Sequence, residues 1–225
     1  MTTPDSAAML SKLGHLAREK VFAEDLTILI DRPDRSDKLL DHPEVNEAMR
    51  ADGYMPYWAE IWPAARMLAK VLSKETFEPG TTALELGCGL GLSGIVALAR
   101  GAKVVFSDYD ACALKFAGDN ALLNGFDRFR LLQLDWRTPP AVLRVPLIIG
   151  ADLIYQERNL EPVIQCIRTM LLPGGRCLLA DQDRVPAAVI QAAMSAAGMA
   201  FTTQVVKASE PGSKRLKGTL YRIRG

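Results

Sequence analysis

The sequence has few of the residues that build metal sites, disulfide frameworks or membrane spans. Among 225 residues there are only two histidines, His15 and His42, and four cysteines that form no Cys-x-x-Cys pair. The cysteines are Cys88, Cys112, Cys166 and Cys177. This pattern excludes most zinc sites and disulfide scaffolds and fits a reducing compartment. No apolar run reaches the ~18 residues that span a bilayer, and no signal sequence is evident. We therefore expect a cytoplasmic protein without a metal ion.

The chain also lacks an excess of charge of either sign. It has 27 Lys and Arg against 26 Asp and Glu, for a net charge of +1. Nothing in this balance indicates a protein that mainly neutralises a nucleic-acid backbone. Basic residues do gather at 207–217, as Lys207, Lys214, Arg215 and Lys217. We expect this segment to be a solvated loop, with contact to a substrate as the alternative.

From about residue 80 onward, short apolar runs alternate with amphipathic ones, which is typical of an α/β fold. Strands are predicted over Thr82–Leu86, Lys103–Asp108, Phe129–Leu134, Leu147–Ala151, Arg176–Ala180, Phe201–Val206 and Thr219–Arg224. The first five are expected to alternate with helices over Leu92–Arg100, Asp110–Asn124 and Asn159–Leu172, with Val185–Ala197 after the fifth. The last two strands have only a loop between them and should form an antiparallel hairpin. The sequence thus predicts a doubly wound, seven-stranded, mostly parallel sheet with an antiparallel last strand.

The residues before 80 are less regular. We predict a helix near Ser6–Glu19, a strand over Leu26–Ile30, a helix over His42–Ala51 and a helix within Trp58–Ser73. The segment is too small and too lightly apolar for a separate domain. It is therefore expected to pack on the core as an N-terminal extension.

A glycine-rich turn follows the first sheet strand, in Glu85-Leu86-Gly87-Cys88-Gly89-Leu90-Gly91. Glycines without side chains let the backbone approach a ligand closely, although a simple tight turn is the alternative. The dinucleotide fingerprint is G-x-G-x-x-G, whereas here the spacing is G-x-G-x-G and Leu92 holds the place of the third glycine. The spacing therefore favours a ligand smaller than a dinucleotide.

Acidic residues follow the next two strands. Asp108 lies 17 residues after Gly91, where a carboxylate can accept both hydroxyls of a ribose. Helix capping is the alternative role for Asp108, but Asp110 is better placed for it. The third strand ends in Asp135-Trp136, which offers an acceptor for an amino group and a ring that can lie on adenine. Together these strand ends predict a site for a nucleoside-bearing cofactor.

The glycine loop and Asp108 resemble the first motif and the second-strand acid of the class I, seven-β-strand methyltransferases, which use S-adenosylmethionine on a Rossmann-like fold. Three further segments are similar to methyltransferase family 16, a group rich in protein-lysine N-methyltransferases. They are Asp152-Leu153-Ile154-Tyr155 after the fourth strand, Pro56-Tyr57-Trp58-Ala59-Glu60-Ile61-Trp62-Pro63-Ala64-Ala65, and Asp135-Trp136. The resemblance implies an N-terminal extension at 1–56 and an S-adenosylmethionine-dependent methyltransferase domain at 57–225.

Site roles follow from this resemblance. It implies that the cofactor is contacted by Trp62, Glu85, Gly87, Cys88, Gly89, Asp108, Asp135, Trp136 and Ala151. Trp62 would cover the cofactor, Asp108 would bind the ribose, and Trp136 would lie beside the adenine. Asp152 and Tyr155 would be catalytic residues that face the acceptor amine, brought to one side if the loop begins a helical turn.

Simpler roles remain open for the same residues. Trp62 could be a buried anchor at a helix start, Tyr155 a core aromatic, and Asp152 a cap of the loop. Tyr57 and Trp58 are expected to serve packing rather than chemistry. The loop after the fourth strand lacks the Asn/Asp-Pro-Pro-aromatic pattern typical of methylases of DNA bases or glutamine amides.

The leading hypothesis is transfer of a methyl group to a lysine side chain of a protein. The alternatives are a small-molecule N-methyltransferase, since one fold hosts many acceptors, and a cofactor-binding regulator without turnover. Nucleic-acid methylation is less favoured because the net charge is near neutral. Nucleotide-dependent oxidoreduction is less favoured because Leu92 holds the place of the third glycine.

Overall fold

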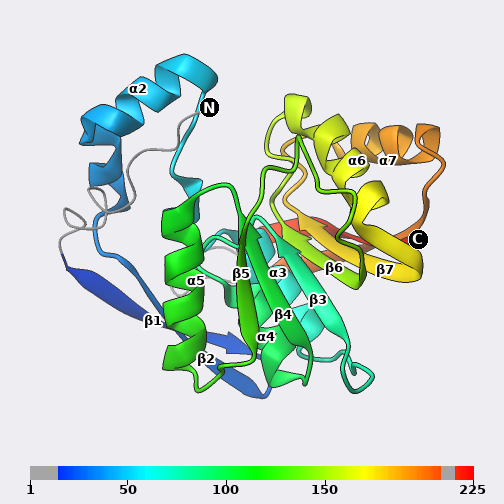
Figure 1. The fold of residues 1–225 in the computed structure, drawn as a ribbon, viewed down its shortest axis with the longest axis horizontal. Coiled ribbons are helices and arrows are strands. Elements are labelled where there is room, and N and C mark those ends of the chain that lie inside the picture. Colours follow the sequence, from blue (N-terminus) through cyan, green and yellow to red (C-terminus); the bar gives the residue numbers. More distant parts are fainter. Residues whose placement is uncertain (1–14, 209–215) are drawn as a thin grey trace.

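The computed structural model describes residues 15–208 and 216–225, which form a layered α/β fold (Figure 1). A seven-stranded sheet has the strand order β5-β4-β3-β6-β7-β9-β8. The strands are β3 (Thr82–Leu86), β4 (Lys103–Asp108), β5 (Phe129–Gln133), β6 (Val145–Ala151), β7 (Leu171–Asp181), β8 (Ala200–Ala208) and β9 (Leu216–Arg224). Neighbouring strands pair in parallel except β9, which runs antiparallel to both β7 and β8. The predicted sheet is confirmed. In this sheet β9 lies between β7 and β8, and β8 is an edge strand.

Helices cover both faces of the sheet, as the apolar strands predicted. One layer contains α3 (Pro63–Leu72), α4 (Leu92–Ala99) and α5 (Ala111–Leu123), and the other contains α6 (Leu160–Met170) and α7 (Ala187–Ala196). Successive residues of β3 divide between the two layers, since Ala83 packs with the α3–α5 cluster and Leu84 with the α6–α7 cluster. Strands buried on both faces carry apolar residues at nearly every position, because neither face meets water.

The expected alternation of strands and helices fails at one place. Residues 134–144, between β5 and β6, contain turns and bends but no helix. The segment includes Pro139-Pro140, and each proline removes a backbone donor and clashes with a preceding helical turn. This loop instead carries Asp135 and Trp136 to the carboxyl edge of the sheet.

The N-terminal segment begins with a hairpin of β1 (Leu16–Ala23) and β2 (Leu26–Pro33), followed by η1 (Ser36–Asp41), α2 (Pro43–Asp52) and η2 (Tyr57–Ala59). The strand expected over Leu26–Ile30 and the helix over His42–Ala51 are confirmed. The helix expected over Ser6–Glu19 is wrong in its described part, because Leu16–Glu19 belong to β1. Side chains there alternate in exposure, as in a strand paired on one face. Residues 1–14 lie outside the described residues.

The helix predicted within Trp58–Ser73 is confirmed as α3. Tyr57–Ala59 form a short 3₁₀ turn, Trp62 is extended, and α3 begins at Pro63. A residue before proline is disfavoured in the helical region, whereas proline fits the first turn of a helix. The segment therefore crosses the sheet edge in extended form and presents Trp62 at the start of α3.

Asn120 of α5 and Asn124, which caps the end of α5, fasten the hairpin to the core. The Asp31 N–H donates to the Asn120 side-chain oxygen at 2.8 Å, and the Asn120 amide donates to Asp31 O at 3.1 Å and Leu90 O at 3.0 Å. Asn124 exchanges the same pair of bonds with Leu29, at 2.9 and 2.7 Å. These bonds hold the hairpin against α5, while the division of the chain into an extension at 1–56 and a domain at 57–225 stays a prediction.

No helix among residues 15–208 and 216–225 has the length and apolarity needed to cross a membrane. The four cysteines are free and buried.

We predict that Asn120→Ala lowers the free energy of unfolding by about 2–4 kcal/mol, because it leaves buried backbone groups of Asp31 and Leu90 without partners. The matched control is Asp119→Ala, which removes an exposed charge on the neighbouring turn of the same helix. Its expected effect is within about 0.5 kcal/mol. Urea denaturation of both variants measures the difference. Equal midpoints for Asn120→Ala and the unsubstituted protein would show that these bonds do not hold the hairpin.

Candidate active site

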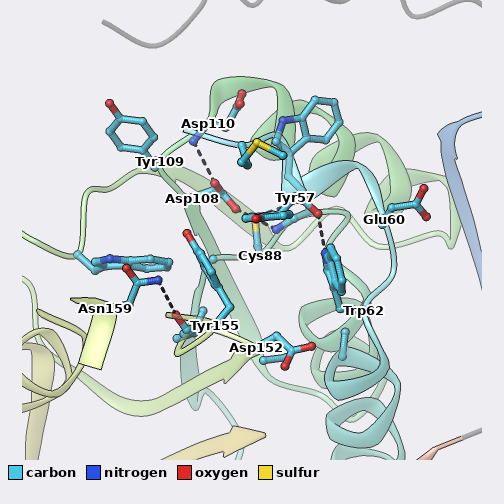
Figure 2. Close-up of a pocket in the computed structure, with 18 of the residues that line it drawn as sticks. Tyr57, Glu60, Trp62, Cys88, Asp108, Tyr109, Asp110, Asp152, Tyr155 and Asn159 are labelled. Carbon is cyan, nitrogen blue, oxygen red and sulfur yellow. Dashed lines mark hydrogen bonds between the residues drawn. The ribbon is translucent and has the colours of Figure 1, made fainter. Parts of the chain in front are cut away.

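A cavity of about 440 Å³ lies at the carboxyl end of the parallel strands. Its wall combines the loops after β3, β4, β5, β6 and β7 with the segment from Gly53 to Trp62 (Figure 2). Open α/β sheets bind ligands in the crevice at this end of their strands, and the volume suits a small molecule. All of the candidate site residues named from the sequence line this cavity.

The glycine loop follows β3 in a conformation that favours glycine. The φ angles of Gly87, Gly89 and Gly91 are 59°, 50° and 84°, in the left-handed region. A Cβ on Gly87 would lie 2.7 Å from Leu153 and 3.2 Å from the Trp136 ring. The loop therefore keeps its inner surface free of side chains, and the Cys88 N–H anchors it to Ser107 O of β4 at 2.9 Å.

The Asp108 carboxylate joins this loop to the end of β4. Its oxygens accept from the N–H of Gly89 and the N–H of Asp110, both at 3.0 Å (Figure 2). Burial raises the pKa of Asp108 to about 6, although these N–H groups oppose the shift. Asp110 caps α5, since its side chain accepts from the Cys112 N–H at 2.7 Å, and it also binds the Tyr54 hydroxyl. The capping role is thus filled by Asp110, as expected, and Asp108 faces the cavity.

Glu85 lies beneath the loop and is almost fully buried. Its carboxyl accepts from the Gly94 N–H at 3.1 Å, in the first turn of α4. Burial raises the pKa of this carboxyl to about 8, with a smaller contribution from the negative Asp108. Glu85 therefore fixes the start of α4 against the loop, and at neutral pH it holds its proton.

The loop after β5 supplies the next wall. The Asp135 carboxylate accepts from the backbone N–H of Arg137 at 2.9 Å and from its guanidinium at 2.8 Å. This pairing fixes the turn that presents the Trp136 ring toward Gly87. Ala151, the last residue of β6, completes the floor between this loop and β7.

Three aromatic rings meet at the other side of the cavity. Tyr57 contacts Trp62 edge to face with ring centroids 5.6 Å apart, and Tyr155 with centroids 5.1 Å apart. The Trp62 indole N–H donates to Tyr57 O at 2.7 Å, and burial raises the pKa of Tyr155. Tyr57 packs against both other rings, as the packing role expected for it predicts, and it also lines the cavity (Figure 2). Trp58 does pack inward, on Phe116 at 5.4 Å.

Asp152 and Tyr155 are not arranged by a helical turn. Asp152 has a left-handed φ of 54°, and residues 152–156 form bends rather than a helix. The Asp152 N–H continues the sheet by donating to Ala180 O at 2.9 Å, which directs the chain away from a right-handed turn. The expectation of one shared helix face is therefore wrong. The two side chains project in different directions around the aromatic cluster (Figure 2).

The Asp152 carboxylate is held by residues that the sequence interpretation missed. It accepts from the backbone N–H of Gln182 at 3.1 Å and from the Gln182 amide at 2.7 Å. Arg184 lies 3.7 Å from it and places its guanidinium 4.8 Å from the centroid of the Trp62 ring. Both follow β7, so the same rule that singled out polar residues after the other strands could have found them. Of the basic loop residues, Lys214 and Arg215 lie outside the described residues.

Comparisons with known proteins agree on one family. A family model described as lysine methyltransferase matches residues 48–193. The histidine protein methyltransferase 1 homolog of Dictyostelium discoideum is 28% identical over 153 residues, which cover 65% of this chain and 48% of that protein. EEF1A lysine methyltransferase 3 of Mus musculus is 27% identical over 173 residues, which cover 74% of each chain. The chain spans about half the length of several of the curated relatives that it matches.

A solved structure extends the likeness to nearly the whole chain. It is the N-methyltransferase NodS from Bradyrhizobium japonicum WM9 in complex with S-adenosyl-L-homocysteine, with a TM-score of 0.57. The match covers 98% of this chain and 97% of that chain at 15% sequence identity. At this identity the likeness shows the fold alone.

We predict that the ligand-free protein loses stability as the pH rises from 5 to 8, and that Glu85→Gln flattens this slope. The folded state keeps the Glu85 proton up to about pH 8, whereas an unfolded carboxyl releases it near its ordinary pKa of 4.5. Unfolding therefore releases a proton in this pH window, so the free energy of unfolding falls by up to about 1.4 kcal/mol for each unit that the pH rises. Urea denaturation at four pH values measures both slopes. Identical slopes would show that Glu85 is already ionised in the folded protein.

Proposed function

This chain belongs to methyltransferase family 16, the lysine methyltransferase family, and from that premise we propose that it methylates a lysine side chain of a protein with S-adenosylmethionine. The observation that carries the proposal is the cavity itself. In one space it combines a glycine loop and strand-end acid suited to a nucleoside with a slot of three aromatic rings and a carboxylate. The first half suits the cofactor and the second suits an amine.

The residues of the first half fit S-adenosylmethionine. A Cβ on Gly87 would clash with Leu153 and with the Trp136 ring, so the loop can lie this close to that ring only with glycine at this position. Asp108 offers a carboxylate for the ribose, and Trp136 and Asp135 offer a ring and an acceptor for the adenine. Gly87, Cys88, Gly89 and Ala151 would hold the methionine portion, Trp62 would cover it, and Glu85 would brace the loop from below.

When bound, the cofactor supplies an activated sulfonium methyl group that a nitrogen lone pair can displace. The protein's task is then to align the nitrogen and exclude water. Tyr57, Trp62 and Tyr155 form a slot whose faces attract a cation and whose bulk keeps the reacting nitrogen dry. Asp152 can accept an N–H bond from the amine and fix its direction.

A lysine must also lose its proton before it can react. The free ammonium has a pKa of about 10.4 and no lone pair, so little of it is reactive at neutral pH. Burial among the aromatic rings and the positive charge of the sulfonium both lower the pKa of the amine. The proton can leave to Asp152 or to water at the cavity mouth.

A protein acceptor is supported by the relatives, whose names describe methylation of histidine in proteins and of lysine in EEF1A. A cytoplasmic location is supported by the buried, free cysteines, since thiols stay reduced in that compartment.

We predict that the protein binds S-adenosylmethionine and S-adenosylhomocysteine but not NAD, and that Asp108→Ala weakens cofactor binding by about 1–3 kcal/mol. The loss follows from removal of the carboxylate that faces the ribose. The exposed Asp127, changed to Ala, is the matched control and should bind normally. Titration calorimetry measures all ligands on the same preparations. Tight binding of NAD without binding of S-adenosylmethionine would overturn the cofactor assignment.

We predict that Asp152→Ala and Tyr155→Ala keep cofactor binding but lose methyl transfer by about 10²-fold or more, the scale for a misplaced reacting pair. Transfer of labelled methyl groups into heat-treated protein from a cell extract measures the rate. Glu161→Ala, on the exposed side of α6, serves as the control and should transfer normally. Full transfer by both site variants would place the acceptor outside this slot, whereas parallel loss of cofactor binding would assign them to the cofactor pocket.

A further inference from the structure

Arg184 lies in the slot proposed for the acceptor amine. Its guanidinium is 4.8 Å from the centroid of the Trp62 ring and 3.7 Å from the Asp152 carboxylate. The Arg184 side chain is 34% exposed and Asp152 only 5%, so the ion pair sits at the border between the buried carboxylate and the open cavity. This position is held by a residue outside every motif discussed above.

The Asp152 carboxylate is left with limited but usable acceptor capacity. Two of its roughly four lone-pair positions are taken by the N–H groups of Gln182. Arg184 adds a positive charge beyond hydrogen-bond distance, so it compensates the charge without filling the remaining positions. An incoming amine can therefore donate to Asp152 while the pair as a whole carries no net charge.

This compensation matters because an isolated carboxylate would work against the reaction. A negative charge a few ångströms from an amine favours the ammonium form and raises the pKa of the amine. A neutral pair removes this effect and leaves burial and the sulfonium charge, which both favour the neutral amine. The guanidinium is suited to this role because arginine keeps its positive charge in proteins and stacks on aromatic faces.

We propose that Arg184 is a positioning residue that neutralises the Asp152 carboxylate, so that the slot receives the acceptor lysine as a neutral amine. The proposal rests on the proposed lysine methyltransferase function and adds a residue that controls its pH dependence. This role also explains why the Arg184 guanidinium lies over the Trp62 ring. Without the guanidinium, the ring face would attract the charged form of the substrate amine.

Other charged groups interact with Asp152 or line the same cavity. Asp181 and Asp183, on either side of Gln182, interact with Asp152. Asp108 at the end of β4, Arg158 in η3 (Glu157–Asn159) and Glu60 before α3 line the cavity. Asp181 and Asp183 repel the Asp152 charge, and burial raises the pKa of Asp181 to about 7. Within 15–208 and 216–225, Arg184 is the cation in ion-pair contact with Asp152. Removal of the Arg184 charge leaves Asp152 with acidic neighbours, and their negative charges favour the ammonium form of the acceptor amine.

The test compares the pH dependence of kcat/KM for the unsubstituted protein, Arg184→Met, Arg184→Lys and Arg168→Met between pH 6.5 and 10. Arg168 is an exposed arginine of α6 and provides the matched control. The acceptor is the heat-treated extract protein used above, with methyl-lysine quantified by mass spectrometry. Calorimetry with S-adenosylmethionine verifies that each variant is folded and binds the cofactor.

Arg184→Met is expected to move the rising limb of the profile to higher pH by about one unit, a tenfold loss at pH 7 that largely disappears at high pH. Arg184→Lys should keep most of the original profile because it keeps the charge, and Arg168→Met should be unchanged. An unshifted profile for Arg184→Met, or a loss equal at every pH, would overturn the role of Arg184 alone. Absence of methyl-lysine with the unsubstituted protein at every pH would instead overturn the proposed function, and the role of Arg184 with it.

Discussion

The hydrogen bond from the Gly89 N–H to the Asp108 carboxylate joins the two halves of the cofactor site. It ties the turn after β3 to the end of β4, while Cys88 is tied to Ser107 on the same strand. Because Gly87, Gly89 and Gly91 all have left-handed backbone angles, the turn needs such fixed points to keep one shape. The same carboxylate that holds the turn faces the cavity, so the bond positions both the backbone cradle and the group suited to a ribose.

Burial sets the charges around this bond. Glu85 lies buried below the loop, and burial raises the pKa of its carboxyl to about 8, which limits the negative charge close to Asp108. Across the cavity, the Asp152 carboxylate has a cationic neighbour, the Arg184 guanidinium at 3.7 Å. Both arrangements reduce the negative charge of the cavity, which suits the proposed pairing of a cationic sulfonium with a neutral amine.

The sequence was sufficient for features that depend on local pattern or on strand ends. Strands such as β3 and β6 are apolar on both faces, so they could be recognised without knowing their neighbours. Asp108 and Trp136 could be found because parallel strands place their carboxyl ends at one edge. A helix was predicted in place of β1 because Leu16–Ala23 are stabilised as a strand by pairing with β2, which no local pattern records.

The arrangement of the residues proposed to bind the acceptor was harder to predict from the sequence, for a physical reason. Its geometry depends on contacts between distant segments: Tyr57 with Tyr155, and Asp152 with Gln182 and Arg184. The left-handed backbone at Asp152 cannot be read from the aspartate alone, and it replaced the helical turn that the three-residue spacing suggested. The family resemblance therefore pointed to Asp152 and Tyr155, which both line the cavity, but not to the residues that hold them.

In the function proposed above, one cavity joins an S-adenosylmethionine site to a slot for a lysine amine. Mass spectrometry of extract protein after reaction with isotopically labelled cofactor tests this pairing by identifying the residue that carries the new methyl group. We expect label on lysine side chains with the unsubstituted protein and loss of that label with Tyr155→Ala. Label found solely on histidine, arginine or small molecules would contradict it.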